Sequence, residues 1–338
     1  MDDARSFRDG VSDRAKALID TSFVCDIVWP EEPRYDNTYE SLDRFHRSGV
    51  DLVSVTLAGD LHNVSEAVQM VAKHRRLVLD QPDRLVLVEK PADIERARAE
   101  RKLGVMFHFE GTRCFERNLD MIAAFFTLGI RFTLPAFNQT NSVGGGCGEE
   151  VDPGLTRLGR SFVHEMERVG MLLDLSHTGY RTTMDAMDMA TKPVIFSHCC
   201  VDALHPHVRN LKDDQMKACA ALGGVIGLSG NSMYLGDDDC RTETLFKHID
   251  YMVELLGPEH VGLGLDVIFK TGPLDDWLRA RPDEWPYAAD PDWPGVTSSL
   301  PEQIPELVDV MLEKGYDEAA IVGILGGNYL RVFRALWD

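Results

Sequence analysis

The sequence predicts a single (β/α)8 barrel, because short apolar segments alternate with amphipathic segments along most of the chain. Near-continuous apolar strands that alternate with helices are typical of a parallel sheet covered by helices on both faces. Eight such apolar segments indicate that the sheet closes into a barrel. Polar residues that end several of these segments are the third observation, because the carboxyl ends of barrel strands share one mouth.

The eight predicted strands are rich in β-branched residues and lie at 17–23, 50–57, 103–110, 130–137, 171–176, 193–197, 224–229 and 260–266. An additional apolar run at 84–90 is expected to be an addition to the second unit. The intervening segments have helical periodicity, and four of them end where a helix C-cap is expected, at Gly49, Gly129, Gly170 and Gly223. A doubly wound open sheet is the alternative, but no glycine-rich fingerprint follows the first strand.

Residues 1–338 are expected to form one domain, because no linker, internal repeat or low-complexity run interrupts the alternation. The segment 270–300 is rich in Pro, Trp and Asp and is too long for an ordinary connection. It is therefore predicted to be a functional loop or lid after the eighth strand. The tail, 301–338, is predicted to be helical.

The composition restricts the class of partner. A net charge of −20 argues against nucleic acid and against anionic membrane surfaces, which both require clustered Lys and Arg. The N-terminus has no apolar signal-peptide segment, and no window reaches the roughly 18 apolar residues of a membrane helix. The seven cysteines are scattered and odd in number, so we expect free thiols and a cytoplasmic protein.

Polar residues at four predicted strand ends form a candidate metal site: Glu110 in FHFEGT, His177 in DLSH, His198 in FSHC and Asp266 in GLGLD. Imidazole and carboxylate together suit Zn²⁺ or a similar ion. A metal held by the first three would leave a position for water and lower its pKa. Asp266 is then the expected general base and acid. A lone histidine at a strand end is more often structural, but four convergent groups favour a metal. For His108, which alternates with Glu110, a structural role in the core is at least as expected as a role behind the ligands.

The stretches around these residues resemble the membrane (renal) dipeptidase family of the amidohydrolase superfamily. The similarity covers most of the chain from Gly104 to the end, through FEGT, GLTRLGRSFVHEMERVGMLLDLSH, KPVIFSHCC, HPHVRNLKDDQM, HVGLGLD and GGNYLRVF. The resemblance implies a (β/α)8 metallohydrolase that cleaves dipeptides, usually with two zinc ions. It also implies a homodimer or larger homo-oligomer.

The resemblance assigns a role to each matching side chain. Glu110 resembles the carboxylate that bridges the two metals, and His177 and His198 resemble the ligands of one of them. Asp266 resembles the catalytic aspartate that follows the eighth strand.

A second part of the resemblance concerns the substrate. Arg209, in HVRN, resembles the arginine that pairs with the substrate's free carboxylate, a role that suits the guanidinium fork. Asn210 is expected to orient this loop or to touch the same carboxylate. From spacing alone, a surface or helix-capping charge is the alternative for Arg209.

Two positions depart from the family pattern. The first strand of the family ends in a His-x-Asp pair that binds the second metal. In LIDTSFVCDIVWP the pair falls either on Ser22 and Val24, neither of which is a credible ligand, or on Val24 and Asp26, where only the aspartate remains. The histidine is lost in both alignments, and Asp26 is the candidate ligand of the second alignment alone. After the fourth strand, Phe137 takes the place of a histidine that helps to polarise the scissile carbonyl.

We therefore expect a hydrolase of a dipeptide-like or other small amide that bears a carboxylate, with one zinc ion per chain and a second ion left open. Losing the second metal also removes whatever held the substrate's free amine, which favours an N-blocked amide, a cyclic amide or a lactone. Two other classes remain: a relative that binds a small ligand without turnover, and a lyase or isomerase in which Asp266 moves a proton.

Overall fold

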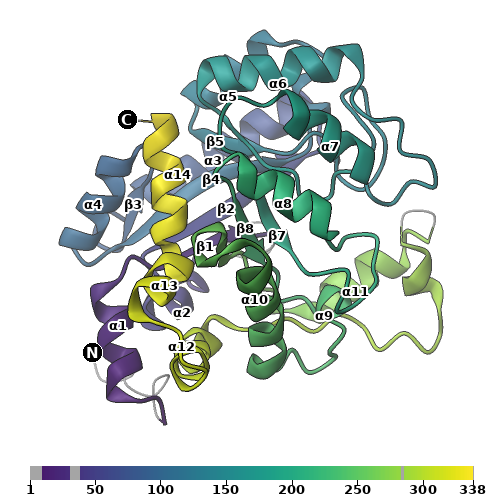
Figure 1. Cartoon of the computed structure of the whole chain (residues 1–338). Helices are drawn as coiled ribbons and strands as arrows, with labels where there is room; N and C mark the ends of the chain where they lie inside the picture. Colours follow the sequence, from purple (N-terminus) through teal and green to yellow (C-terminus); the bar gives the residue numbers. More distant parts are fainter. Residues whose placement is uncertain (1–9, 31–38, 283–284, 338) are drawn as a thin grey trace.

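The computed structural model describes residues 10–30, 39–282 and 285–337, and it confirms the barrel (Figure 1). The described strands are all parallel, in the order β6-β5-β4-β2-β1-β9-β8-β7, and a parallel bridge between Asp174 and Ile195 joins the segment after β6 to β7. Strand β3 pairs with β4 outside this order, which confirms 84–90 as an addition. The strands are β1 (Cys25–Trp29), β2 (Leu52–Gly59), β3 (Leu85–Leu87), β4 (Leu103–Glu110), β5 (Ile130–Thr133), β6 (Leu172–Leu173), β7 (Ile195–Cys199), β8 (Val225–Leu228) and β9 (Val261–Leu263).

Helices surround the strands, and the four predicted glycine caps are confirmed (Figure 1). Gly49, Gly129, Gly170 and Gly223 all have φ between 72° and 108°, the left-handed region that glycine adopts without a steric penalty. The helices are α1 (Asp13–Thr21), α2 (Leu42–Arg47), α3 (Val64–Leu79), α4 (Pro91–Ala99), α5 (Asp120–Thr127), α6 (Arg157–Val169), α7 (Tyr180–Met189), α8 (Asp213–Ala221), α9 (Ser232–Leu235), α10 (Thr242–Leu256), α11 (Thr271–Arg279), α12 (Ile304–Glu313), α13 (Glu318–Val322) and α14 (Asn328–Trp337).

The first predicted strand, at 17–23, is wrong, because most of that segment belongs to α1 and the first strand begins at Cys25. The Ser12 side chain caps α1 by accepting the backbone N–H of Ala15. Ala15, Leu18 and Ile19 are buried at helical spacing. An apolar run this short fits one turn of an amphipathic helix as well as a strand, so its periodicity did not separate the two.

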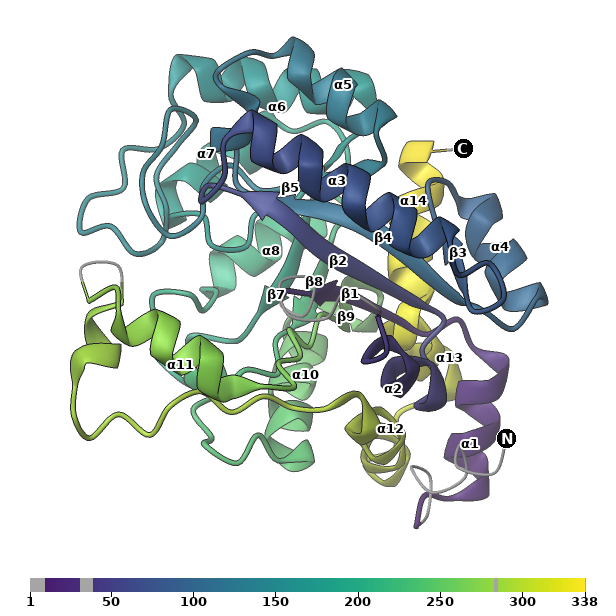
Figure 2. The ribbon, with the colours of Figure 1, turned by 180° about the vertical axis from the view of Figure 1, so that it is seen from behind.

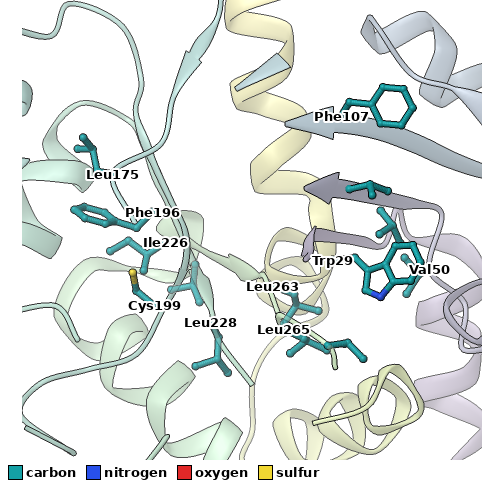
Figure 3. Packing of buried hydrophobic residues seen from close by; sticks show 14 of the residues in the cluster. Trp29, Val50, Phe107, Leu175, Phe196, Cys199, Ile226, Leu228, Leu263 and Leu265 are labelled. Carbon is teal, nitrogen blue, oxygen red and sulfur yellow. The ribbon is translucent and has the colours of Figure 1, made fainter. Parts of the chain in front are cut away.

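The apolar core has two main parts. The larger part contains residues from strands and surrounding helices, and Figure 3 shows Phe196, Ile226 and Leu228 of β7 and β8 near Leu263 of β9. The smaller part fills the barrel where strands begin, and α14 supplies Tyr329, Val332 and Phe333 to it.

The helical stretch 318–337, which contains α14, is long and apolar enough to span a membrane by length and composition alone. Charged residues such as Glu318 and Arg331 interrupt it, so it does not stand out in the sequence as a continuous apolar run. Its buried residues include Tyr329 and Phe333, which pack against residues that begin the strands, such as Leu52 and Ile195. This packing identifies the stretch as a core helix of the barrel.

The segment predicted to be a lid, 270–300, contains α11 and a short 3-10 helix at Pro286–Ala289. Figures 1 and 2 place α11 on the opposite side of the molecule from α14. Ile268, Leu278, Trp285, Ala288 and Val296 form an apolar cluster that is separate from both parts of the barrel core.

Candidate metal centre

Three of the predicted side chains converge at the carboxyl ends of the strands. Glu110 ends β4, His198 lies on β7, and His177 lies in the segment after β6. The ligand atoms of these residues all lie within 4.8 Å of one another, and they form the only such group of three among the residues that the structure describes. The two Nε2 atoms are 2.8 Å apart, and His198 Nε2 is 3.6 Å from Glu110 Oε1.

A buried carboxylate fixes the orientation of His198. The Ser197 hydroxyl donates to Asp174 Oδ2 at 2.5 Å and lies 2.7 Å from His198 Nδ1. Because this hydroxyl donates to the carboxylate, it accepts the Nδ1–H of the imidazole. Asp174 also accepts the backbone N–H groups of Ser176 and Ser197, which keep its side chain in place. His198 therefore presents the lone pair of Nε2 to the mouth.

His177 is oriented by an amide. Its Nδ1 lies 2.8 Å from Asn138 Oδ1, which accepts the ring N–H. His177 and Asn138 have φ of 61° and 58°, a region that residues other than glycine adopt rarely and at a cost. The Phe137 ring stacks on the imidazole, with ring centroids 4.2 Å apart. His177 therefore also presents the lone pair of its Nε2.

The resulting donor set fits a divalent cation. Two Nε2 lone pairs face each other beside the carboxylate of Glu110, an arrangement that is repulsive unless a positive charge lies between them. Burial, followed by the charge of Arg209, lowers the pKa of both imidazoles well below their ordinary value, so a shared proton is disfavoured. Two imidazoles and one carboxylate with an open side are typical of catalytic zinc sites.

The position of Glu110 depends on a sharp turn. Gly111 has φ of 120°, and a Cβ at this position would lie 2.4 Å from Asp60 Cγ, so only glycine fits here. Asp60 follows β2 and connects three segments around the mouth through its two carboxylate oxygens. Its donors are the backbone N–H groups of Thr112, Arg113 and Phe137 and the side-chain amide of Asn141.

Asp266 lines the same cavity as Glu110 and His177. Burial raises its pKa to about 6, although the charge of Arg209 and a hydrogen bond from the Asn231 side chain act in the opposite direction. Its φ of 57° is again in the left-handed region. A buried carboxylate with a pKa near 6 is ionised at neutral pH and basic enough to take a proton.

Asp26 does not join this group. Its Oδ1 accepts the backbone N–H of Leu265 at 2.9 Å and that of Val28 at 3.5 Å, and its Oδ2 has no hydrogen-bond partner among the described atoms. Burial raises its pKa to about 7. A bulge lies between Asp26 and Trp29, and both Ile27 and Val28 belong to the apolar cluster at the barrel base.

Arg209 and Asn210 are buried but do not line the cavity. The Arg209 guanidinium donates to His198 O and Cys199 Sγ, and it lies 5.0 Å from the ring centre of Tyr234, which does line the cavity. Its buried Nε has no partner among the described atoms. The Asn210 amide donates to His205 O and Tyr234 O, so it holds the loop in place.

The comparisons with known proteins agree with the fold and with this donor set. The family described as membrane dipeptidase (peptidase family M19) matches residues 27–275. The chain belongs to this family. Its members are metal-dependent peptidases, which agrees with the donor set of Glu110, His177 and His198.

Individual relatives extend the match. An uncharacterised protein in the pqqA 5′ region of Klebsiella pneumoniae is 30% identical over 281 residues, which is 80% of this chain and 96% of the relative. Dipeptidase tcpJ of Claviceps purpurea is 27% identical over 284 residues, 82% of this chain and 62% of its own length. The crystal structure of an amidohydrolase from Pseudomonas aeruginosa has a TM-score of 0.87 at 26% identity, with 96% and 99% of the two chains covered.

His108 is a core residue within this family fold. Its two ring nitrogens lie 2.8 Å from the hydroxyls of Ser54 and Thr56, and the ring stacks on Phe132 at 4.3 Å. Burial lowers its pKa to about 3. The structure therefore favours the structural role that the sequence left open for this histidine.

Sequence reasoning missed the residues that hold the donors in place: Asp60, Asn138, Asp174, Ser197 and Asn231. Two of them were visible in the motifs, because Asp174 stands three residues before His177 in DLSH and Ser197 stands directly before His198 in FSH. Asp60 and Asn231 each follow a predicted strand, which was a signal of the same kind as the one used for the ligands.

Proposed function

We propose that this chain is a hydrolase of a dipeptide-like or other small amide and works with one divalent cation, with zinc as the first candidate. The observation that carries the proposal is the pair of Nε2 lone pairs that Asn138 and the Ser197–Asp174 pair direct at each other beside Glu110. Such a donor set favours an ion that is bound by the protein and keeps an open position.

Glu110, His177 and His198 would hold the divalent ion, which would supply the polarisation of a carbonyl oxygen and lower the pKa of water. The side chains of the chain perform the proton transfers. Asp266, ionised above about pH 6, accepts a proton from the attacking water while the water oxygen bonds to the carbonyl carbon. The C–N bond then breaks, and Asp266 returns the proton to the leaving amine. Asn231, which hydrogen-bonds this carboxylate, keeps it oriented between the two transfers.

The test is amine release from small amides by the purified protein with one equivalent of zinc. The panel contains L-alanyl-L-alanine and N-propanoyl-L-alanine, which differ in the α-ammonium group. We expect turnover of at least one compound, its loss with a chelator and its recovery when zinc is returned. Tight zinc binding without hydrolysis of any amide would contradict the proposal and favour a ligand-binding relative or a lyase or isomerase.

A further inference from the structure

We propose that the substrate presents a planar apolar group, of the size of a phenyl ring, next to the scissile amide and carries no α-ammonium group there. The inference rests on the proposed function and names the substrate class for that site. It depends on three properties of the cavity: its aromatic wall, the charges of the described lining residues, and the attachment of this wall to the metal centre.

The cavity beside Glu110, His177 and Asp266 has a volume of about 150 Å³ and a mainly apolar lining. Its aromatic residues come from three parts of the chain: Phe137 after β5, Tyr234 on α9, and Trp277 and Trp285 from the segment after β9. Aromatic and thioether side chains adapt well to flat apolar ligands. The aliphatic and thioether lining includes Leu57, Leu61, Met70, Met233, Ile268, Leu274 and Leu278.

The aromatic rings of Phe137, Trp277 and Trp285 are inclined to one another in a way that allows a further ring to bind against them. The ring centroids of Trp285 and Phe137 are 6.3 Å apart, with an interplanar angle of 64°. The ring centroids of Trp277 and Trp285 are also 6.3 Å apart, with an angle of 58°. Such inclined pairs offer ring faces and edges in different directions, which a guest ring can meet by stacking or by edge-to-face contact.

This wall is attached directly to the metal centre. Phe137 stacks on His177, and the backbone N–H of Phe137 donates to Asp60 Oδ2 at 2.9 Å. A ring held against Phe137 therefore lies beside the reacting amide. This geometry places the apolar group next to the scissile bond rather than at a distant end of the substrate.

The charges of the lining do not favour an ammonium group. Among the described lining residues the carboxylates are Asp60, Glu110 and Asp266. Both oxygens of Asp60 already accept two hydrogen bonds each from the surrounding segments. The other two carboxylates belong to the catalytic centre. Among the described lining residues no carboxylate is therefore left for an α-ammonium group, and such a group would lose its hydration without a carboxylate partner from these residues, which is costly.

Four matched compounds separate the two parts of the inference. N-(3-phenylpropanoyl)-L-alanine has the ring without the ammonium group, L-phenylalanyl-L-alanine has both, N-propanoyl-L-alanine has neither, and L-alanyl-L-alanine has only the ammonium group. We expect kcat/KM of the zinc-loaded protein to be highest for the first compound, with each unfavourable change costing about tenfold or more. Equal or higher kcat/KM for either free dipeptide would overturn the inference.

A pair of tryptophan variants tests the wall. Trp277 lines the cavity, whereas Trp293 belongs to the same segment, packs beneath Arg279 and does not line the cavity. Trp277→Ala is expected to lower kcat/KM about tenfold for the phenylpropanoyl compound and less than twofold for the propanoyl compound. Trp293→Ala is expected to change neither. An equal loss for both compounds in Trp277→Ala would contradict a ring-binding role.

A binding measurement separates this inference from the proposed function. Calorimetric titration of zinc-loaded Asp266→Asn with the same four compounds reports affinity without turnover. At least tenfold tighter binding of the phenylpropanoyl compound than of the other three supports the inference even if no compound is hydrolysed. Equal affinities would overturn it, whether or not the wild-type protein is a hydrolase.

Discussion

The carboxyl ends of β4 and β7 and the segment after β6 differ from β1, where Asp26 is the second residue of the strand and does not line the cavity. Glu110 on β4, His198 on β7 and His177 after β6 direct their donor atoms at one point. At β1, Asp26 uses one carboxylate oxygen for the backbone N–H of Leu265, and its ligand atoms do not join the group.

The difference lies in the neighbours of each side chain more than in its chemical type. His198 and His177 each have a hydrogen-bond partner on the far ring nitrogen, which leaves Nε2 available. Asp26 Oδ1 accepts the backbone N–H groups of Leu265 and Val28. The neighbouring side chains of Ile27 and Val28 belong to the apolar cluster that also contains Leu52 and Ile195. Asp26 keeps one carboxylate oxygen without a hydrogen-bond partner among the described atoms, but it lies near the start of β1 and outside the group of ligand atoms.

The largest effect on activity is expected from Asp266→Asn, which removes the proton acceptor beside Glu110 and His177. We expect kcat to fall by about 10²–10⁴-fold while zinc content stays unchanged. Because burial raises the pKa of Asp266 to about 6, the carboxylate is lost below that pH. In the wild-type protein, kcat/KM is therefore expected to fall about tenfold per pH unit below pH 6 and to be flat above pH 7.

A pH–rate profile of the zinc-loaded protein measures this dependence, and atomic absorption measures the zinc. A variant that keeps most of its activity, or that loses its zinc, would show that Asp266 has another role. A wild-type profile without a fall near pH 6 would also contradict the assignment of this carboxylate as the base.

A smaller effect is expected from Ser197→Ala, which removes the hydroxyl that accepts from His198 Nδ1 and donates to the Asp174 carboxylate. We expect zinc affinity to fall about 10–100-fold, because the imidazole loses its fixed tautomer and orientation. Competition with a chromogenic chelator measures the dissociation constant. Ser54→Ala is the matched control, because Ser54 forms a similar buried pair with His108, which is not a ligand. Equal losses in both variants would indicate a general effect of removing a buried hydroxyl.

The smallest effect on activity is expected from Asp26→Asn, which changes a side chain of β1 outside the group of metal-ligand atoms. Burial raises the pKa of Asp26 from an ordinary value of 3.8 to about 7, so the folded protein binds a proton that the unfolded chain releases. This contribution to stability is therefore present below about pH 4 and lost as the pH rises to 7. Asparagine keeps the acceptor oxygen and does not titrate.

We expect the metal-free Asp26→Asn variant to be more stable than the wild type by about 2 kcal/mol at pH 8, with a smaller difference at pH 5. Urea denaturation at the two pH values measures this. If the gain in the free energy of unfolding of Asp26→Asn over the wild type were smaller at pH 8 than at pH 5, its pH dependence would have the opposite sign. That result would contradict a buried neutral carboxyl at β1.

Much of this fold was predictable, because a barrel repeats the same local pattern. Apolar runs and glycine caps identified seven of the eight ring strands, and Glu110, His177 and His198 could be grouped from their places at strand ends. The strand at 17–23 failed because a short apolar run has no decisive period.

The supporting hydrogen bonds could not be read in the same way. Asp60 receives donors from residues 52 to 81 positions further along the chain, and Leu265 lies 239 residues from Asp26. Such contacts follow from the closed barrel, and no local pattern specifies them. The register shift between Asp26 and Trp29 likewise arises from the pairing of β1 with β2.

The most direct test is the zinc content per chain of the wild type, His177→Ala and Asp26→Asn, by elemental analysis after dialysis against zinc. The account predicts about one zinc in the wild type and in Asp26→Asn, and almost none in His177→Ala, because three ligands define a single catalytic site. About two zinc ions in the wild type, falling to about one in Asp26→Asn, would contradict it and make Asp26 a metal ligand.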